Sequence, residues 1–272
     1  MTHFRNSTAL VTGASSGLGE EFARQLAPVV GRLVLLARRT AALERLKADL
    51  ESRHAQLRVQ VFTVDLADEE ARAEFLGELR GRDLVPDLLV NNAGLGDRGD
   101  FGSGEWSKNS AMLQVNVVAL THFAFELVPQ MRERGRGIII NVSSLACLLP
   151  IPDFAVYAAT KAYVSSLSEA LRLEVRGSGI EVLALCPGPV RTEFGSVAAR
   201  RSEDRQRAVG ARAFYVSKEV VVRRALEGAA HGRARVYPGI MVCMAAGLLS
   251  ALPLVIIRAI MSRRPRRMDS NV

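Results

Sequence analysis

The 272-residue sequence predicts an α/β fold, a single doubly wound domain on a seven-stranded, mostly parallel sheet with helices on both faces. Short runs of apolar, β-branched residues alternate with longer amphipathic stretches. Nearly every side chain in these runs is apolar, as in strands that are covered on both faces. The expected strands are 8–12, 32–37, 57–65, 87–91, 137–142, 180–185 and a short one at 235–237.

The amphipathic stretches between these runs predict the helices. Asp68 is the expected N-cap of one of them, because Glu69 and Glu70 follow it and acidic side chains favour the first turn of a helix. Repeated strand–helix–strand units imply parallel strands, and hence a doubly wound sheet. The expected helices are 17–27, 40–53, 68–80, 105–131, 153–176 and 217–230.

Charge is distributed unevenly along the chain. Residues 191–272 hold 16 of the 36 Lys and Arg residues but 6 of the 28 Asp and Glu residues, a net charge of +10 against −2 for residues 1–190. A nucleic-acid-binding fold needs a basic main body and arginines interleaved with aromatic residues, so no nucleic-acid partner is expected. The basic third instead suits cofactor phosphates, an anionic carrier or a lipid surface.

The cysteine and histidine residues predict no metal site. The three cysteines lack the spacing of metal ligands or redox pairs, and the four histidines lie far apart in the sequence. An odd number of cysteines, together with an N-terminus without an apolar run, indicates a reducing compartment. A cytoplasmic location is therefore expected.

A glycine-rich turn follows the first expected strand. Residues 12–19 read Thr-Gly-Ala-Ser-Ser-Gly-Leu-Gly and lead into an amphipathic helix. Gly13 would let the chain turn out of the strand, while Gly17 and Gly19 would let the backbone approach a pyrophosphate at the helix N-terminus. A second glycine-rich string, 94–99, opens no amphipathic helix and is interpreted as a loop at the mouth of a site.

Two arginines, Arg38 and Arg39, end the second expected strand, where the adenosine ribose of a dinucleotide would lie. A carboxylate there would select NAD(H), whereas two guanidinium groups suit the 2′-phosphate of NADP(H). The alternative is an ordinary solvated pair, but a helix N-terminus disfavours cations. NADP(H) is therefore the preferred cofactor and NAD(H) the alternative.

Tyr157 and Lys161 form the single Tyr-x-x-x-Lys pattern in the sequence. The i, i+4 spacing places both on one helix face, and a nearby ammonium stabilises a phenolate and lowers the pKa of the tyrosine. Ser143 and Ser144 end the fifth expected strand, at the sheet edge where ligands bind. A hydroxyl there would hold a substrate oxygen beside the phenol, which indicates general acid–base chemistry.

In this order and spacing, the residues resemble the short-chain dehydrogenase/reductase family, of the type with a Thr-Gly-x-x-x-Gly-x-Gly cofactor motif and a Tyr-x-x-x-Lys site. The likeness extends over residues 6–195, and more weakly to about 238. It implies a Rossmann fold and an NAD(P)-dependent oxidoreductase acting on alcohols or ketones. The matching positions are 12–19, Asp65, Leu66, 91–94, Asn116, Ser144, Tyr157, Lys161 and 187–192.

The resemblance also implies roles for individual residues. Tyr157 would be the general acid–base, Lys161 would lower its pKa and bind the nicotinamide ribose, and Ser144 would orient the substrate. Asn116 would hold a water that relays protons to Lys161. The implied cofactor site, which includes Tyr157 and Lys161, comprises Gly13, Ser15, Ser16, Gly17, Leu18 and Gly19 at the glycine-rich turn, Arg38, Arg39, Asp65 and Leu66 around the adenosine, Asn92, Ala93 and Gly94 beside the fourth strand, and Pro187, Val190 and Thr192 near the nicotinamide.

Residues 236–257 are 22 consecutive uncharged residues, and a basic tail at 258–267 follows them. The stretch is just long enough to span a bilayer, but prolines and glycines interrupt it, and a span would carry the basic tail across the membrane. Two interpretations stay open. One is a buried helix pair that covers the substrate cleft or a subunit interface; the other is peripheral docking of 240–267 on an anionic membrane.

The expected organisation is a catalytic domain over 1–239, with a substrate lid at about 191–216, and an apolar helical extension with a basic tail over 240–272. The expected activity is NADP(H)-dependent interconversion of a ketone and a secondary alcohol. Because the last third of the chain should line the pocket and is rich in aliphatic residues, we expect an apolar lipid, fatty-acyl or steroid-like substrate. The resemblance implies a homodimer or homotetramer. The alternative is a nucleotide-binding, membrane-associated or partner-binding module with incidental catalysis.

Overall fold

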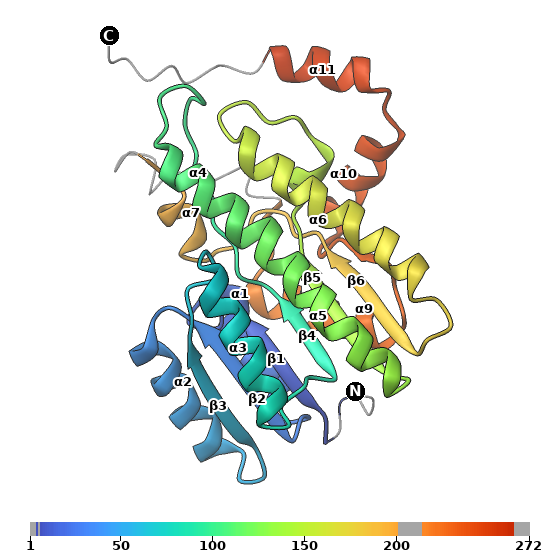
Figure 1. Ribbon diagram of the computed structural model, residues 1–272. Coiled ribbons are helices and arrows are strands. Elements are labelled where there is room, and N and C mark those ends of the chain that lie inside the picture. The colour runs from blue at the N-terminus through green and yellow to red at the C-terminus, as the bar shows by residue number, and fades with distance from the viewer. Residues whose placement is uncertain (1–3, 5, 201–213, 264–272) are drawn as a thin grey trace.

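A computed structural model describes residues 4, 6–200 and 214–263 of the chain. Seven strands form one sheet in the order β3-β2-β1-β4-β5-β6-β7 (Figure 1). Every strand pair is parallel, so the sheet is parallel throughout rather than mostly parallel. The predicted strands agree with the observed ones to within two residues at each end. Their bounds are β1 (Thr8–Thr12), β2 (Arg32–Ala37), β3 (Arg58–Thr63), β4 (Leu88–Asn91), β5 (Gly137–Val142), β6 (Ile180–Leu185) and β7 (Arg235–Val236).

The predicted helices are also found, with one interruption. The helix expected at 105–131 is one long rod in which a π-helical segment, η2 (Gln114–Ala119), separates α4 (Trp106–Leu113) from α5 (Leu120–Glu133). Asp68 caps α3 as predicted, because its side chain accepts hydrogen bonds from two backbone N–H groups of the first turn. The other helices are α1 (Gly17–Leu26), α2 (Thr40–Arg53), α3 (Glu69–Gly81), η3 (Leu145–Leu148), α6 (Ala155–Glu174), α7 (Phe194–Val197), α9 (Lys218–Ala230), α10 (Ile240–Ala251) and α11 (Leu254–Ser262).

Two apolar cores hold the helices against opposite faces of the sheet. The first core joins α1, α2 and α9 to the sheet, and the second joins α3, α5 and the end of α6 to the other face (Figure 1). Alternate residues of β2 belong to different cores: Leu33 to the first and Val34 to the second. This alternation is the reason that both sides of each strand are apolar in the sequence.

The chain reverses its direction of travel across the sheet between β1 and β4, which are neighbours although β2 and β3 lie between them in the sequence. In a doubly wound sheet the connections on either side of such a point diverge and leave a crevice at the carboxyl ends of the strands. The residues that follow β1, β4, β5 and β6 therefore meet at this edge.

The apolar C-terminal stretch forms α10 and α11, which bend by 115° at the break between them. Among the described residues, this bent pair and the rod Trp106–Glu133 are apolar and long enough to be compared with membrane spans. Half of the most apolar part of that rod is buried, and its residues Val115, Phe123 and Leu127 belong to the second core. It is therefore a core helix of the domain.

Candidate active site

A cleft of about 1640 Å³ lies at the carboxyl edge of the sheet. Of the residues predicted for the catalytic and cofactor sites, all line this cleft except Gly19 and Asn116. The loop 94–99, which was expected at the mouth of a site, contributes several of its lining residues. Residues 201–213 of the predicted lid and the tail arginines Arg264, Arg266 and Arg267 lie outside the described residues.

The glycine-rich turn has the geometry that a close phosphate approach requires. Gly13 and Gly17 have φ values of +66° and +61°, in the left-handed region that glycine adopts without strain. A Cβ atom on Gly13 would lie 2.8 Å from the Cα atom of Ala93. Gly19 lies behind the cleft, where a Cβ atom would collide with the carbonyl group of Gly13. Its role here is to let α1 pack against the turn.

Thr12 and Asn92 fasten this turn to the neighbouring strand. The Thr12 hydroxyl accepts hydrogen bonds from the backbone N–H groups of Asn92 and Ala93, both at 3.0 Å. The Asn92 amide in turn donates to the Thr12 carbonyl oxygen at 2.9 Å. These bonds span about 80 residues of sequence and fix the ends of β1 and β4 relative to each other.

Four side chains gather at the end of the cleft beyond β2 and β3. Arg39 donates to the Ser15 carbonyl oxygen at 3.2 Å and lies 3.4 Å from a carboxylate oxygen of Glu193. Arg38 lies 3.9 Å from the Asp65 carboxylate. More than half of each arginine side chain is exposed, so these ion pairs are weak. Leu66 is buried beside them and adds an apolar surface.

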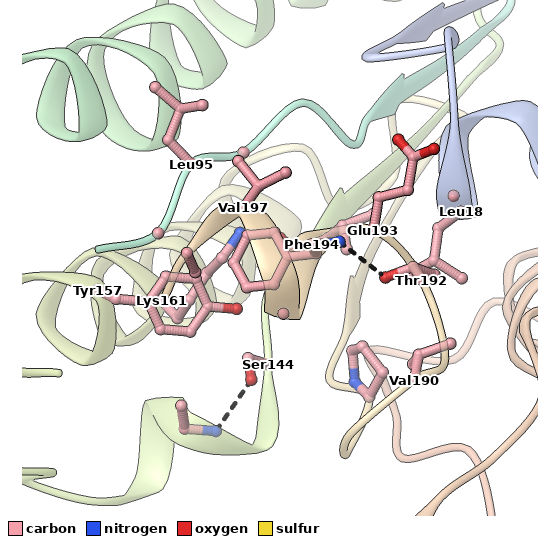
Figure 2. A pocket seen from close by; sticks show the side chains of 18 of the residues that line it. Leu18, Leu95, Ser144, Tyr157, Lys161, Val190, Thr192, Glu193, Phe194 and Val197 are labelled. Carbon is pink, nitrogen blue, oxygen red and sulfur yellow. Dashed lines mark hydrogen bonds between the residues drawn. The ribbon is translucent and has the colours of Figure 1, made fainter. Parts of the chain in front are cut away.

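Three of the predicted catalytic residues, Ser144, Tyr157 and Lys161, lie together at the opposite end of the cleft (Figure 2). Tyr157 is 7% exposed, and its ring stacks on Phe154 with 4.2 Å between the ring centroids. Lys161 is 4% exposed; its ammonium donates to the Val142 carbonyl oxygen at 2.8 Å and lies 5.7 Å from the centroid of the Tyr157 ring. Ser144 caps η3 by accepting from the Ala146 N–H at 3.2 Å.

Burial shifts the pKa values of both groups toward the neutral form. Burial raises the pKa of Tyr157 to about 12, although a hydrogen bond with Ser144 lowers it in part. Burial also lowers the pKa of Lys161 to about 8. The expectation that Lys161 lowers the pKa of the tyrosine therefore differs from the structure. The physical reason is that desolvation penalises the charged forms of both groups, and the ammonium is directed to a backbone carbonyl rather than to the phenol oxygen.

The buried Lys161 should give the free energy of unfolding a distinct pH dependence. Its pKa is about 8 in the fold and 10.5 ordinarily, so between these values the unfolded chain binds more protons and stability rises with pH. We expect a gain of up to about 3 kcal/mol, at about 1.36 kcal/mol per pKa unit. Tyr157, whose pKa is raised, opposes this gain only above its ordinary value of 10.0.

Urea unfolding at several pH values, with Lys161→Met beside the unmodified protein, measures this effect. The substitution should remove the rise in stability between about pH 8 and 10. Loss of the bond to Val142 will change the overall stability of the variant, but it will not change how stability varies with pH. The same rise in stability with pH in both proteins would show that Lys161 is not its cause.

Asn116 lies in the π-helical segment and holds the loop above the catalytic residues. Its Oδ1 accepts from the Leu95 N–H at 2.8 Å, and its Nδ2 donates to the Leu95 carbonyl oxygen at 2.9 Å and to the Thr160 hydroxyl at 3.0 Å. The side chain of Asn116 is thus fully engaged with the loop and with α6. Isolated π-turns in long helices are frequent at functional sites.

The sequence indicated most of the segments around the cleft, but it did not single out the side chains that form its wall around Tyr157. They come from the loop after β4, from η3 and the segment after it, from α7 and from α10. All of them are apolar, but only Leu149 and Phe154 lie near the catalytic motif in the sequence. They are Leu95, Leu149, Phe154, Phe194, Val197, Ala245 and Leu249.

A buried ion pair closes one side of this wall. Arg200 donates to both carboxylate oxygens of Asp97, at 2.6 to 3.0 Å, and to the Asp100 carbonyl oxygen at 2.8 Å. The side chains of Arg200 and Asp97 are 17% and 6% exposed. Beside them, the Arg98 N–H donates to the Ala198 carbonyl oxygen at 2.8 Å. The pair therefore joins the loop after β4 to the segment after α7.

Breaking the Arg200–Asp97 pair should destabilise the fold, because the Arg200 guanidinium would lose its carboxylate partner while it stays largely shielded from water. Asp97→Asn keeps one acceptor, so we expect a loss of about 3 kcal/mol in the free energy of unfolding, the low end for a broken buried pair. The control is Glu126→Gln, in the more exposed Arg80–Glu126 pair, which should cost less than about 1 kcal/mol. Chemical denaturation of both variants measures the difference, and equal losses would refute the argument.

Comparisons with known proteins agree with this geometry. A family model described as short chain dehydrogenase matches residues 7–203. An oxidoreductase of Mycobacterium tuberculosis without a characterised activity is 34% identical over 220 residues, which are 80% of this chain and 87% of that protein.

Two solved structures share the fold over almost their whole lengths. The bulky-bulky ketone specific alcohol dehydrogenase of Comamonas testosteroni has a TM-score of 0.76 and 26% identity, and the match covers 98% of this chain and 96% of that one. A short-chain dehydrogenase of Sphingobium yanoikuyae in complex with NADPH has a TM-score of 0.79 and 28% identity, with 97% and 100% covered. The chain therefore belongs to the short-chain dehydrogenase/reductase family and is an NAD(P)-dependent oxidoreductase.

Proposed function

We propose that this enzyme interconverts an apolar ketone and the corresponding secondary alcohol with NADP(H). The observation that carries the proposal is the arrangement of one cleft: Ser144, Tyr157 and Lys161 lie among apolar side chains at one end, and Arg38 and Arg39 lie at the other. The glycine-rich turn between the two ends fits a pyrophosphate, because side chains are excluded there.

The protein residues would supply orientation and the proton. In the direction of reduction, the Ser144 hydroxyl holds the carbonyl oxygen, and Tyr157 donates its phenolic proton to that oxygen. In the direction of oxidation, Tyr157 takes the proton back. Lys161, with its ammonium 5.7 Å from the centroid of the Tyr157 ring, would provide a positive charge close to a phenolate when one forms. The nicotinamide cofactor, when bound, supplies or accepts the hydride.

Asn116 would act on this centre through the loop that it holds. Its bonds to Leu95 fix the apolar wall beside Lys161, and its bond to Thr160 joins the loop to the helix that carries both Tyr157 and Lys161. We therefore assign the side chain of Asn116 a positioning role.

The preference for NADP(H) is supported by charge at the end of β2. Arg38 and Arg39 stand where a carboxylate would select the ribose 2′-hydroxyl of NAD(H), and their present ion pairs are long and exposed. Guanidinium groups bind phosphate through charge-assisted hydrogen bonds. The relative from Sphingobium yanoikuyae was solved with NADPH, which agrees with this preference.

The apolar wall around Tyr157 supports a hydrophobic substrate. Purified protein assayed for NADPH oxidation should prefer long-chain or aryl ketones and 3-oxoacyl thioesters to hydroxylated ketones. Along a series of straight-chain 2-ketones, kcat/KM should rise roughly three- to fourfold per methylene group until the pocket is filled, from about 0.8 kcal/mol per buried CH₂. Equal or faster turnover of dihydroxyacetone would overturn the assignment of an apolar substrate.

We also expect a homodimer or homotetramer in the cytoplasm. Exposed apolar side chains on α4 and α5, among them Trp106 and Phe125, offer surface for contact between copies of the chain. Cys147, Cys186 and Cys243 are all free, which agrees with a reducing compartment. Sedimentation or light scattering of the purified enzyme tests the assembly, and a monomer at micromolar concentration would exclude it.

A further inference from the structure

Helix α10 is apolar on every side, although only one side is covered by protein. Val242 and Ala246 are buried, and Ala245 and Leu249 line the cleft. On the opposite side, Ile240, Met244 and Leu248 recur at intervals of four residues and are 80%, 64% and 63% exposed. A surface helix of a soluble protein normally carries polar side chains there. The exposed side of α10 is thus unexplained by the fold.

Helix α11 extends this apolar surface. Leu254, Val255, Ile256 and Ile260 are all exposed, while Ile257 is buried. With 12 and 9 residues, α10 and α11 are about 18 and 14 Å long, and each is shorter than the roughly 30 Å hydrocarbon core of a bilayer. The 115° bend means that they do not form one straight span. Figure 1 shows α11 at the outer edge of the molecule, beyond α10.

All formal charge that flanks α10 and α11 in the sequence, as far as Asp269, is positive. Arg258 lies in α11 and Arg263 follows it, and the sequence continues with Arg264, Arg266 and Arg267, which lie outside the described residues. No Asp or Glu occurs in the sequence between Glu227 and Asp269. Apolar side chains flanked by arginines complement the acyl chains and the anionic headgroups of a lipid surface.

A second copy of the chain fits this surface less well. In a twofold interface the same patch meets itself, so the arginines of one copy would face those of the other. Such pairing adds like-charge repulsion, whereas an anionic membrane adds attraction. We propose that α10 and α11 dock in the interfacial layer of an anionic membrane without crossing it. The docking does not depend on the reaction that the enzyme catalyses.

Binding of the full-length protein to phosphatidylcholine vesicles, with and without phosphatidylglycerol, tests the proposal by co-sedimentation. We expect binding to the anionic vesicles that weakens as salt is added. Leu248→Glu should reduce binding by about 10²-fold, because it removes an apolar side chain that docking would bury in the membrane and adds a charge of the wrong sign. The matched control is Leu173→Glu, a leucine on α6 that is 71% exposed, and it should bind as the unmodified protein does.

A second pair of variants separates charge from apolar contact. Arg258→Gln combined with Arg263→Gln should weaken binding by about 25-fold, at about fivefold per arginine near the surface. Arg45→Gln with Arg53→Gln, on the exposed side of α2, removes the same charge elsewhere and should have no more than a small effect. Circular dichroism and thermal unfolding establish that all variants are folded.

Three outcomes would overturn the proposal: no binding to anionic vesicles, equal losses for Leu248→Glu and Leu173→Glu, or a change of oligomeric state in Leu248→Glu without any vesicle binding. The last outcome would assign the surface to a second copy. The Tyr157→Phe variant should bind vesicles as the unmodified protein does. A failure of the proposed reaction is thereby distinguished from a failure of docking.

Discussion

Replacing Tyr157 by phenylalanine should lower kcat for ketone reduction by at least about 10²-fold, the low end of what a general acid contributes. The substitution removes one oxygen atom and leaves the stack on Phe154, whose centroid is 4.2 Å away, in place. Because the pKa of Tyr157 is raised to about 12, the phenol is protonated throughout the neutral range and is ready to donate. The protonation of Tyr157 should therefore cause little change in the kcat of ketone reduction between about pH 6 and 9.

The same helix offers a matched control. Tyr163 lies six residues further along α6, is 40% exposed, and its hydroxyl bonds to Thr121 at 3.0 Å rather than to the cleft. Tyr163→Phe should keep kcat within about twofold, since it removes an exposed hydrogen bond with a small net contribution. The dissociation constant for NADPH, measured by fluorescence titration, should be similar in both variants. Retention of more than a tenth of kcat in Tyr157→Phe would show that another group delivers the proton.

The fold could be predicted from the sequence because each layer has a local signal. Strands covered on both faces are apolar throughout, as β2 illustrates, and the helices between them show the period of a surface helix. Both the glycine-rich turn and the Tyr157–Lys161 pair are short motifs whose spacing matches their structural context. From these motifs, most of the site could be predicted to lie at one edge of the sheet.

The features that could not be predicted depend on contacts between residues that are far apart in the sequence. The π-helical segment at Asn116 coincides with side-chain bonds to Leu95 and Thr160, and no periodicity in the sequence reports such bonds. The direction of the pKa shift at Tyr157 depends on how deeply the phenol is buried, which the i, i+4 spacing does not give. Likewise, the apolar stretch after 236 does not tell which side of α10 faces the cleft.

Replacing both Arg38 and Arg39 by alanine should change the cofactor preference more than any other pair of substitutions in the cleft. Charge-assisted hydrogen bonds contribute about 1.5–3 kcal/mol each, so loss of the pair should lower kcat/KM for NADPH by about 10²-fold or more. In the structure these arginines are held by ion pairs of 3.9 and 3.4 Å with Asp65 and Glu193, in which their side chains are more than half exposed. Exposed pairs of this kind cost little to exchange for a phosphate.

In the Arg38→Ala, Arg39→Ala double variant, kcat/KM for NADH should change by less than about threefold, because NADH has no 2′-phosphate for the guanidinium groups to bind. A general effect of charge is excluded by Arg45→Ala, an exposed arginine on α2 that does not line the cleft; it should leave the ratio of NADPH to NADH activity unchanged. Equal losses with both cofactors would mean that Arg38 and Arg39 maintain the end of the cleft rather than recognise a phosphate. In that case their bonds to Ser15 and Asp65 would be their principal contribution.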